Sequence, residues 1–212
     1  EINVNLHWIH SESLTVENAE SKLKGLDGVL VAPGFGVRGV EGKIKAIQYI
    51  RENNIPFLGI CLGMQMAVIE FARNVLGLED ANSTEMDKKT PHPVINLMEE
   101  QKNISDMGGT MRLGAWDCKL EKGTKVYEAY STEMISERHR HRYEFNNDYL
   151  EKFTKAGMKI SGINPETKLV ETIEIPNHHY FVGVQYHPEY KSTVLNPHPL
   201  FVAFVKACLE TK

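Results

Sequence analysis

The segment Gly59-Ile60-Cys61-Leu62-Gly63 constrains this chain most, because it joins two apolar stretches without a loop. Residues 56–60 before it are typical of a short buried strand, and residues 62–76 after it predict a strongly apolar helix. A direct turn from strand to helix needs neighbours without bulk on both sides of its apex, and the two glycines meet that need. The pattern predicts a nucleophile elbow with Cys61 at its apex.

Cys61 would stand at the N-terminus of the 62–76 helix, where the helix dipole and free N–H groups favour a thiolate over a thiol. The N–H of Leu62 would be a ready donor to an oxyanion. The alternative is that Cys61 is one more small buried hydrophobic residue, as most free cysteines are. The motif by itself leaves both interpretations open, because a nucleophilic thiol also needs a base.

A base is available in His187-Pro188-Glu189, which follows the apolar strand pattern of residues 180–186. This segment and Cys61 would both lie at the C-terminal ends of strands, the edge where α/β sheets hold their sites. Glu189 is spaced to orient the imidazole while His187 takes the thiol proton. Alone, His187 would be interpreted as a hydrogen-bonded loop histidine; together with the elbow it predicts a catalytic Cys-His-Glu site.

The order of elements predicts an α/β fold with a doubly wound, flavodoxin-like, mostly parallel sheet and helices on both faces. Strand and helix patterns alternate in the first half, with strands at 2–9, 28–32 and 56–60 and helices at 15–26, 42–53 and 62–76. The second half adds strands, expected to be antiparallel, at 110–120, 159–163, 169–175 and 180–186, and helices at 149–156 and 199–209. Residues 79–106 are polar and contain two prolines, so we expect a surface loop there.

Charge and composition exclude several functions. With 24 Lys and Arg against 28 Asp and Glu, the net charge is −4, so no basic excess is available to bind nucleic acid through bulk charge. No apolar run approaches the ~20 residues of a membrane-spanning helix, and no signal segment is recognisable. Cys61, Cys118 and Cys208 form no Cys-x-x-Cys pair, so we expect neither a disulfide framework nor a zinc site, in a reducing, cytoplasmic setting.

Two further motifs suggest chemistry that the surrounding sequence does not support. The glycine-rich run at 34–39 follows a strand as a dinucleotide fingerprint does, but no acidic residue ends the next strand to bind a ribose. Its N–H groups are better suited to face an oxyanion beside the elbow. In Arg138-His139-Arg140-His141-Arg142, alternation on a strand would separate the arginines from the histidines. An arginine fork for a small carboxylate or phosphate is favoured over metal binding, and a solvated charged face is the alternative.

Six stretches of the chain together resemble the class I glutamine amidotransferases and, among them, the CTP synthase family. GICLGMQ (59–65) and VQYHPE (184–189) are the motifs of the class. The stretches more specific to the CTP synthase family are LVAPGFGVRGVEGK (30–43), ANSTE (81–85), GGTMRLG (108–114) and RHRHRYEFN (138–146). They occur in order and cover nearly the whole chain.

The resemblance implies an activity and the residues that perform it. Cys61 would attack the side-chain amide of glutamine and form a glutamyl thioester, with His187 as base and acid and Glu189 orienting it. The N–H groups of Gly34 and Leu62 would form the oxyanion hole.

The same resemblance implies the residues that bind ligands. Gly34, Gln65, Glu85 and Arg142 would bind glutamine, with Glu85 on its α-ammonium and Arg142 on its α-carboxylate. Arg38 would lie in the loop that the family links to GTP, its allosteric activator, and residues 108–114 would form a lid near the ammonia passage.

The resemblance also implies partners outside these residues. A synthetase (amidoligase) domain would bind ATP, UTP and Mg²⁺ and use the ammonia to make CTP, whereas this glutaminase domain would need no cofactor and no metal. Members of the family form homo-oligomers, namely tetramers and in some cases filaments, and we expect no nucleic-acid or membrane partner. The alternatives are another class I glutaminase and a non-catalytic regulatory or assembly module. The 108–114 and 138–146 stretches argue against the first, and the complete triad argues against the second.

The chain departs from the family at two places. Ala32-Pro33-Gly34 stands where the family has Pro-Gly-Gly; Pro33 cannot donate a hydrogen bond, although Gly34 can. The family's glutaminase domain also has a strand and helix before the pattern at 2–9, and a sheet without that central strand would keep an open slot with unpaired backbone groups. We expect residues 1–212 to be a single domain that this strand and helix complete.

Overall fold

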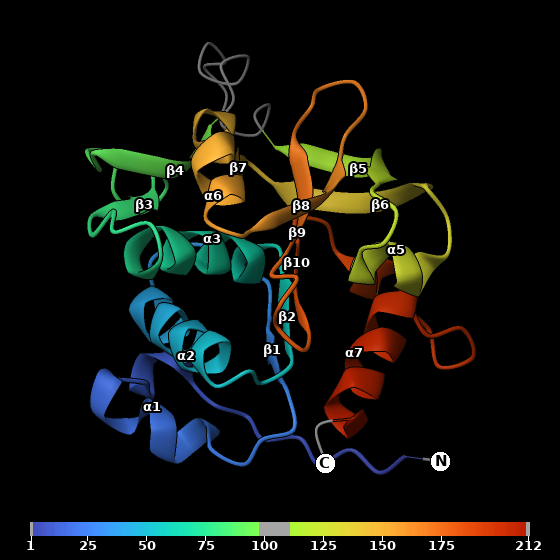
Figure 1. Cartoon of the computed structure of the whole chain (residues 1–212), viewed down its shortest axis with the longest axis horizontal. Helices are drawn as coiled ribbons and strands as arrows, with labels where there is room; N and C mark the ends of the chain where they lie inside the picture. Colours follow the sequence, from blue (N-terminus) through green and yellow to red (C-terminus); the bar gives the residue numbers. More distant parts are fainter. Residues whose placement is uncertain (1, 98–110, 211–212) are drawn as a thin grey trace.

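The computed structural model describes residues 2–97 and 111–210, which form an α/β domain around one central sheet (Figure 1). The sheet runs in the order β1-β2-β10-β9-β8-β5-β6. Its strands are β1 (Val29–Val31), β2 (Phe57–Ile60), β5 (Arg112–Leu120), β6 (Met134–His141), β8 (Lys159–Ile163), β9 (Val170–Glu174) and β10 (Phe181–Val184). The predicted α/β class is confirmed.

Parallel and antiparallel strands occupy different parts of this sheet. β1, β2 and β10 are parallel, and every residue of β2 and β10 is buried, as their continuous apolar runs predict. β9, β8, β5 and β6 follow in antiparallel pairs, which confirms the antiparallel strands expected in the second half of the chain. Because β2 and β10 are neighbours with Ile60 opposite Val184, their C-terminal ends lie side by side.

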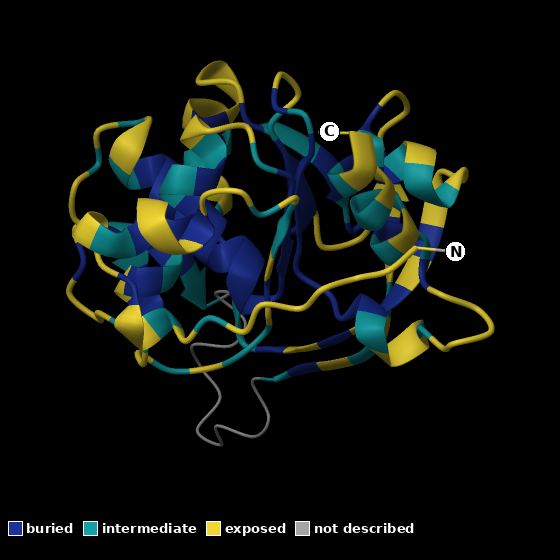
Figure 2. Cartoon of the chain, turned by 90° about the horizontal axis from the view of Figure 1, so that it is seen from below, coloured by how far each residue is buried: buried dark blue, intermediate teal, exposed yellow. Residues whose placement is uncertain are grey.

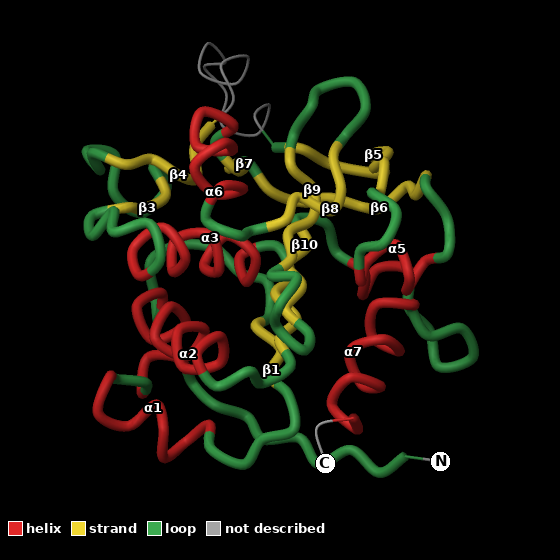
Figure 3. Tube along the Cα trace, viewed as in Figure 1, coloured by secondary structure: helices red, strands yellow, loops and turns green. Residues whose placement is uncertain are grey.

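Helices cover both faces of the parallel strands (Figures 1 and 3). On one side lie α1 (Val16–Leu23), α2 (Val40–Glu52), α3 (Leu62–Asn74) and, further along the chain, α6 (Leu150–Lys155); on the other lie α5 (Lys125–Tyr130) and α7 (Pro199–Glu210). Two buried apolar clusters fill the space between the sheet and these helices, and buried residues follow the sheet in Figure 2. None of the described helices is long and apolar enough to cross a membrane.

The surface loop predicted at 79–106 is wrong for nine of the 19 residues that the structure describes there, which lie in strands. β3 (Ala81–Ser83) and β4 (His92–Leu97) lie in this segment and form a second sheet with β7 (Tyr143–Phe145). Ala81, Val94 and Ile95 are fully buried in the apolar cluster that includes α3. The polar composition of the segment concealed these few apolar residues. Residues 98–106 lie outside the described part of the chain.

The strand predicted at residues 2–9 is also wrong, because the structure has neither helix nor strand there. Ile2, Val4, Leu6 and Trp8 are all exposed, Trp8 by 86%, along the extended N-terminal segment seen in Figure 2. The alternating pattern is present, but no described strand pairs with its backbone, and a strand exists only through such pairing. Among the described strands, β1 is the edge of the sheet on this side.

The predicted elbow is confirmed by the backbone around Cys61. Cys61 has φ 50° and ψ −101°, a conformation that costs a residue other than glycine about 1–3 kcal/mol. A Cβ added to Gly59 would lie 2.8 Å from the carbonyl carbon of Gly63. A Cβ added to Gly63 would lie 2.3 Å from the carbonyl oxygen of Val31. The two glycines therefore let α3 approach β1 and β2 closely enough to form the turn.

Replacing Gly63 with alanine is expected to lower the free energy of unfolding by about 3 kcal/mol, because the new methyl group would meet backbone atoms that have no room to move. Urea-induced unfolding measures the change. Gly123→Ala is the control: its methyl group would meet nothing within 4 Å, so only its positive φ of 76° is penalised, by about 1–2 kcal/mol. A loss no larger than that of the control would contradict the close approach of α3.

Candidate active site

The elbow places Cys61 at the C-terminal end of β2, beside the end of β10. The N–H of Cys61 donates to the carbonyl of Val184 (2.7 Å), which ties the elbow to β10. From Val184 the chain runs through Gln185 and Tyr186 to His187. The structure therefore brings the predicted nucleophile and the predicted base to the same edge of the sheet.

His187 and Glu189 make the contact that their spacing predicts. His187 Nδ1 lies 2.6 Å from Glu189 Oε1, and the Tyr190 ring stacks on the imidazole with 4.8 Å between ring centroids. The N–H of His187 donates to the carbonyl of Arg138 (2.8 Å), which holds the short helix η4 (Pro188–Lys191) against β6. His187 Nε2 is buried without a hydrogen-bond partner among the described residues. With the Nδ1 proton donated to the carboxylate, Nε2 is the nitrogen left to exchange a proton.

A pocket gathers most of the other predicted residues around Cys61. Its lining consists of Gly34, Phe35, Cys61, Gln65, Glu85, His141, Arg142 and Tyr143. The four residues predicted to bind glutamine are all among them. The two predicted oxyanion donors, Gly34 and Leu62, lie close together. A Cβ added to Gly34 would lie 3.2 Å from Leu62 Cδ2.

The pocket carries one side chain of each charge. Glu85 contributes a carboxylate, whose Oε1 accepts a hydrogen bond from the N–H of Gly36 (3.0 Å). This bond joins the segment after β3 to the glycine-rich loop after β1. Arg142 contributes a guanidinium. A carboxylate and a guanidinium in one small pocket complement a zwitterion, the charge pattern of a free amino acid.

Gln185 supports the pocket and was not among the predicted site residues. Gln65 Nε2 donates to the carbonyl of Tyr143 (2.9 Å) and to Gln185 Oε1 (3.2 Å). Gln185 Nε2 in turn points at Cys61 Sγ, 3.7 Å away. Both glutamines are buried, so these contacts fix the positions of the elbow, α3 and β7 relative to one another. The signal for Gln185 was its place in VQYHPE, two residues before His187.

Burial controls the protonation of the nucleophile candidate. Removal from water raises the pKa of Cys61 to about 12, and the hydrogen bond from the backbone N–H of Leu62 opposes this only in part. The negative charges of Glu144, Glu189 and Glu85 raise the pKa of the thiol further. The thiolate expected from the helix N-terminus is therefore not the resting form, and a base has to take the proton.

The predicted alternation at 138–142 is confirmed on β6 and just beyond its end. Arg138 and Arg140 are exposed, whereas His139 and His141 are each only 2% exposed. Of the three arginines, Arg142 is the one that lines the pocket, and the fork for a small carboxylate or phosphate stays a prediction. Among the described residues, no group of three or more His, Cys, Asp or Glu side chains is arranged to hold a metal ion.

Arg38 and the described residues of the predicted lid are not among the residues that line the pocket. Arg38 is on the exposed loop before α2, where its guanidinium forms a 3.7 Å ion pair with Glu12. Its side chain is 85% exposed and does not line the pocket. Of the predicted lid at 108–114, residues 108–110 lie outside the described part of the chain, and Arg112 begins β5.

Comparisons with known proteins identify the family of this chain. The family model described as glutamine amidotransferase class-I matches residues 1–207. Two curated proteins called CTP synthase, from Flavobacterium johnsoniae and Flavobacterium psychrophilum, are 66% and 67% identical over 210 and 212 residues. These matches cover 99% and 100% of this chain but 39% and 40% of the relatives.

A solved structure is also similar to this chain. The Trypanosoma brucei CTPS glutaminase domain with bound acivicin is 42% identical and superposes with a TM-score of 0.93, covering 99% of this chain and 82% of that chain. The chain belongs to the class I glutamine amidotransferase family. Within that family it is a glutaminase domain of the CTP synthase type, and it spans about two fifths of the length of the curated relatives it matches.

Alkylation of Cys61 by iodoacetamide is expected to be slow at pH 7 and to quicken about tenfold per pH unit up to pH 9, because only the thiolate reacts. A pKa of about 12 leaves the thiolate a small and still rising fraction throughout this range. Mass-spectrometric peptide mapping follows the Cys61 adduct, with half-buried Cys208 as the internal reference. A rate that levels off below pH 8 would show instead that His187 already holds the thiol proton in the resting molecule.

Proposed function

We propose that this chain hydrolyses the side-chain amide of L-glutamine to glutamate and ammonia. The observation that carries the proposal is the pocket in which Cys61, at a strained elbow, lies with Glu85 and Arg142. The two charged side chains complement the α-ammonium and α-carboxylate of an amino acid, which would direct its side-chain amide to the thiol. Membership of the class I glutamine amidotransferase family supports glutamine as that amino acid.

The first half of the reaction forms a thioester. Because burial keeps Cys61 protonated, its proton passes to His187 Nε2 as Sγ attacks the amide carbon. The N–H groups of Gly34 and Leu62 donate to the oxyanion of the tetrahedral intermediate. The imidazolium then gives its proton to the departing nitrogen, the C–N bond breaks, and ammonia leaves a glutamyl thioester behind.

The second half releases glutamate. His187 Nε2 takes a proton from water, whose oxygen attacks the thioester carbonyl, and the same proton returns to the Cys61 sulfur as the C–S bond breaks. Glu189 acts throughout by holding the imidazole through Nδ1, at 2.6 Å, and by stabilising its charged form. Cys61 is thus the nucleophile, His187 the base and then the acid, and Glu189 the residue that orients His187.

The whole protein's activity extends beyond the residues described here. We propose that the ammonia is used by a synthetase domain that converts UTP to CTP with ATP and Mg²⁺, in line with the name CTP synthase of the curated relatives. GTP would activate the reaction through the loop of Arg38, whose side chain is exposed and cationic. Assembly into homo-oligomers, tetramers and filaments among them, and a cytoplasmic location belong to the same proposal.

The exposed edge of β1 supports a further part of the proposal, that residues 1–212 are a single domain whose sheet takes one more strand. Leu30 in the middle of β1 is 41% exposed, and β1 pairs with β2 alone among the described strands. The apolar side chains at 2, 4, 6 and 8 are exposed on the neighbouring N-terminal segment. A strand between them would pair both backbones and bury both apolar sets.

Cys61→Ala is expected to lower the rate of glutamine hydrolysis by at least about 1,000-fold, since no other side chain can form the thioester. The assay measures glutamate and ammonia released from L-glutamine. Cys208→Ala is the control, because Cys208 is on α7 and does not line the pocket, so this variant should leave the rate unchanged. Full activity in Cys61→Ala would refute the nucleophile.

Glu85→Gln is expected to raise the KM for glutamine about 10- to 100-fold with a smaller change in kcat, because one hydrogen bond to a charged group is worth about 1.5–3 kcal/mol. Steady-state kinetics over a range of glutamine concentrations separates the two constants. Glu79→Gln serves as control, since Glu79 is exposed and does not line the pocket. An unchanged KM in Glu85→Gln would place the α-ammonium elsewhere.

A further inference from the structure

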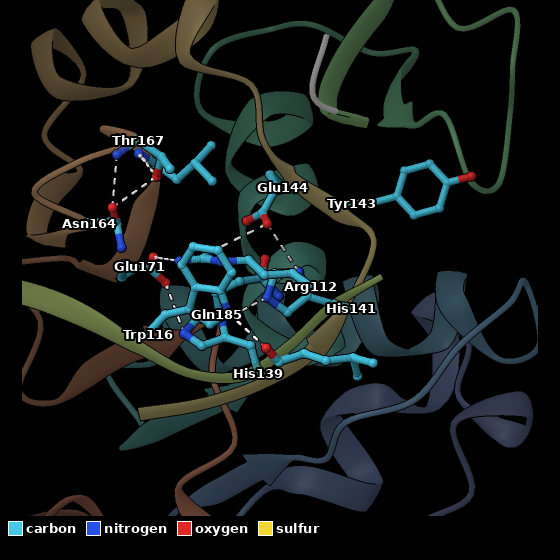
Figure 4. A network of polar contacts seen from close by, with 12 residues as sticks. Arg112, Trp116, His139, His141, Tyr143, Glu144, Asn164, Thr167, Glu171 and Gln185 are labelled. Carbon is cyan, nitrogen blue, oxygen red and sulfur yellow. Dashed lines mark hydrogen bonds and ion pairs between the residues drawn. The ribbon is translucent and has the colours of Figure 1, made fainter. Parts of the chain in front are cut away.

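Alternation along β6 buries a row of three polar side chains, and the proposed reaction uses none of them. Glu137, His139 and His141 are each no more than 2% exposed. Figure 4 shows the two histidines in a cluster with Arg112 and Glu171, in which Arg112 Nη2 lies 2.6 Å from Glu171 Oε1. Glu137, earlier on the strand, belongs to a different cluster. A buried carboxyl group is costly unless donors surround it, so the partners of Glu137 decide what it stabilises.

Three side chains converge on one carboxyl oxygen of Glu137. The Tyr130 hydroxyl donates to Oε1 at 3.1 Å, and His198 Nε2 and Lys191 Nζ lie 3.1 Å and 3.4 Å from the same oxygen. His198 Nδ1 accepts from the N–H of Leu200 at 3.3 Å, so Nε2 carries the imidazole proton and donates it to Glu137. An ionised carboxylate, which can only accept, fits these three donors.

One of the three contacts leads to the residue before the proposed base. The Tyr130 hydroxyl is also hydrogen-bonded to the hydroxyl of Tyr186, 3.2 Å away. Tyr186 is fully buried and immediately precedes His187. Burial raises the pKa of both phenols, so both keep the protons that these hydrogen bonds need. The position of Tyr186 therefore depends on Glu137 through one intermediate side chain.

A second contact leads to the other end of the same segment. Lys191 is the last residue of η4, which also contains Glu189. Its Nζ donates to the carbonyl of Ser136 at 2.7 Å and to Glu137 at 3.4 Å, and both acceptors are on β6. These bonds hold η4 against β6. Glu137 is thus connected to the chain on both sides of the pair formed by His187 and Glu189.

The position of this segment matters for the proposed reaction. His187 has to keep its Nδ1 at 2.6 Å from Glu189 Oε1 while its Nε2 meets the thiol of Cys61. A displacement of about 1 Å can lower the rate of an enzyme about 100-fold. Neither Glu137 nor any of the three side chains that it binds lines the pocket, so its loss would move the base without removing a pocket residue.

The same carboxylate also stabilises two helices. Tyr130 is the last residue of α5, and His198 directly precedes α7. Replacing Glu137 is therefore expected to lower the free energy of unfolding whatever happens to catalysis. Glu174 on β9 offers a matched structural control: it is 2% exposed, and its two oxygens accept the first two N–H groups of α5 at 3.0 Å and 2.9 Å.

We propose that Glu137 is a positioning residue for the proposed base: by binding side chains that lead to both ends of the segment 186–191, its carboxylate fixes this segment and directs His187 Nε2 toward the thiol. Glu137 itself touches neither glutamine nor the reacting atoms. The effect on the rate rests on the proposed glutamine hydrolysis, whereas the effect on the contact between His187 and Glu189 does not.

Kinetics of three variants separate positioning from stability. Glu137→Leu removes the acceptor and is expected to lower kcat about 10- to 100-fold, with the KM for glutamine changed less than about threefold. Glu137→Gln keeps a carbonyl oxygen for the three donors and is expected to retain a kcat at least about tenfold above that of Glu137→Leu. Glu174→Leu is expected to lower the urea midpoint but leave kcat within about twofold of wild type. Equal kcat in Glu137→Leu and Glu174→Leu, or a rise in KM alone, would overturn the proposal.

Lys191→Met keeps the buried carboxyl group and tests the same idea if Glu137→Leu does not fold. Its expected result is a kcat lowered about 3- to 10-fold at unchanged KM, because η4 loses its hydrogen bonds to β6. Lys125→Met is the control, since Lys125 Nζ also donates to a backbone carbonyl, that of Pro176 at 3.1 Å, but belongs to α5. Equal kcat in the two lysine variants would contradict a role for η4 anchoring.

Proton NMR of ¹⁵N-histidine-labelled protein tests the positioning without any assay of activity. A proton held between Nδ1 and a carboxylate at 2.6 Å exchanges slowly with water and gives a downfield signal. We expect this signal in wild type and Glu137→Gln, its loss in Glu137→Leu, and its assignment from His187→Gln. An unchanged signal in Glu137→Leu would refute the positioning. If the signal depends on residue 137 as expected but the wild-type protein releases no glutamate, the proposed function fails and the positioning stands.

Discussion

The short distance between α3 and the strands beneath it is the constraint on which the rest of this structure depends. The backbone turns at Cys61 with a positive φ, and this is possible only because Gly59 and Gly63 leave no side chain where the helix and strands meet. The strain is offset by the fully buried core on both sides of β2 and β10. A rigid core thus carries a strained residue at the one edge where it can meet a substrate.

A second constraint comes from the polar groups that this edge buries. The pocket draws on segments far apart in sequence, and buried side chains join them: Gln65 and Gln185 link the elbow to β7, and His187 is held through Glu189 and the carbonyl of Arg138. Such groups are stable only when each finds a partner. Burial also raises the pKa of Cys61, so the site depends on a neighbouring base rather than on a ready thiolate.

Much of the fold could be predicted because its signals are local. The apolar runs of β2 and β10 and the glycine spacing of the elbow each lie within a few residues, and the structure confirms them. The segment at 2–9 shows the limit of such signals: its alternation is that of a strand, but pairing depends on a neighbour that the pattern does not contain. β3 and β4 were missed because their segment is polar overall, although the few apolar residues in it are buried against α3.

The sequence by itself determined the elbow, the spacing of His187 and Glu189, and the alternation that buries His139 and His141, because each depends on residues close together in the chain. Only the tertiary structure decided which distant residues meet: Arg142 in the pocket while Arg138 and Arg140 face solvent, Gln185 beside Cys61, and Arg112 between Glu144 and Glu171. The physical reason is that pairing and burial of charges depend on distances in space. Those distances are set by the order of strands in the sheet, which no local pattern contains.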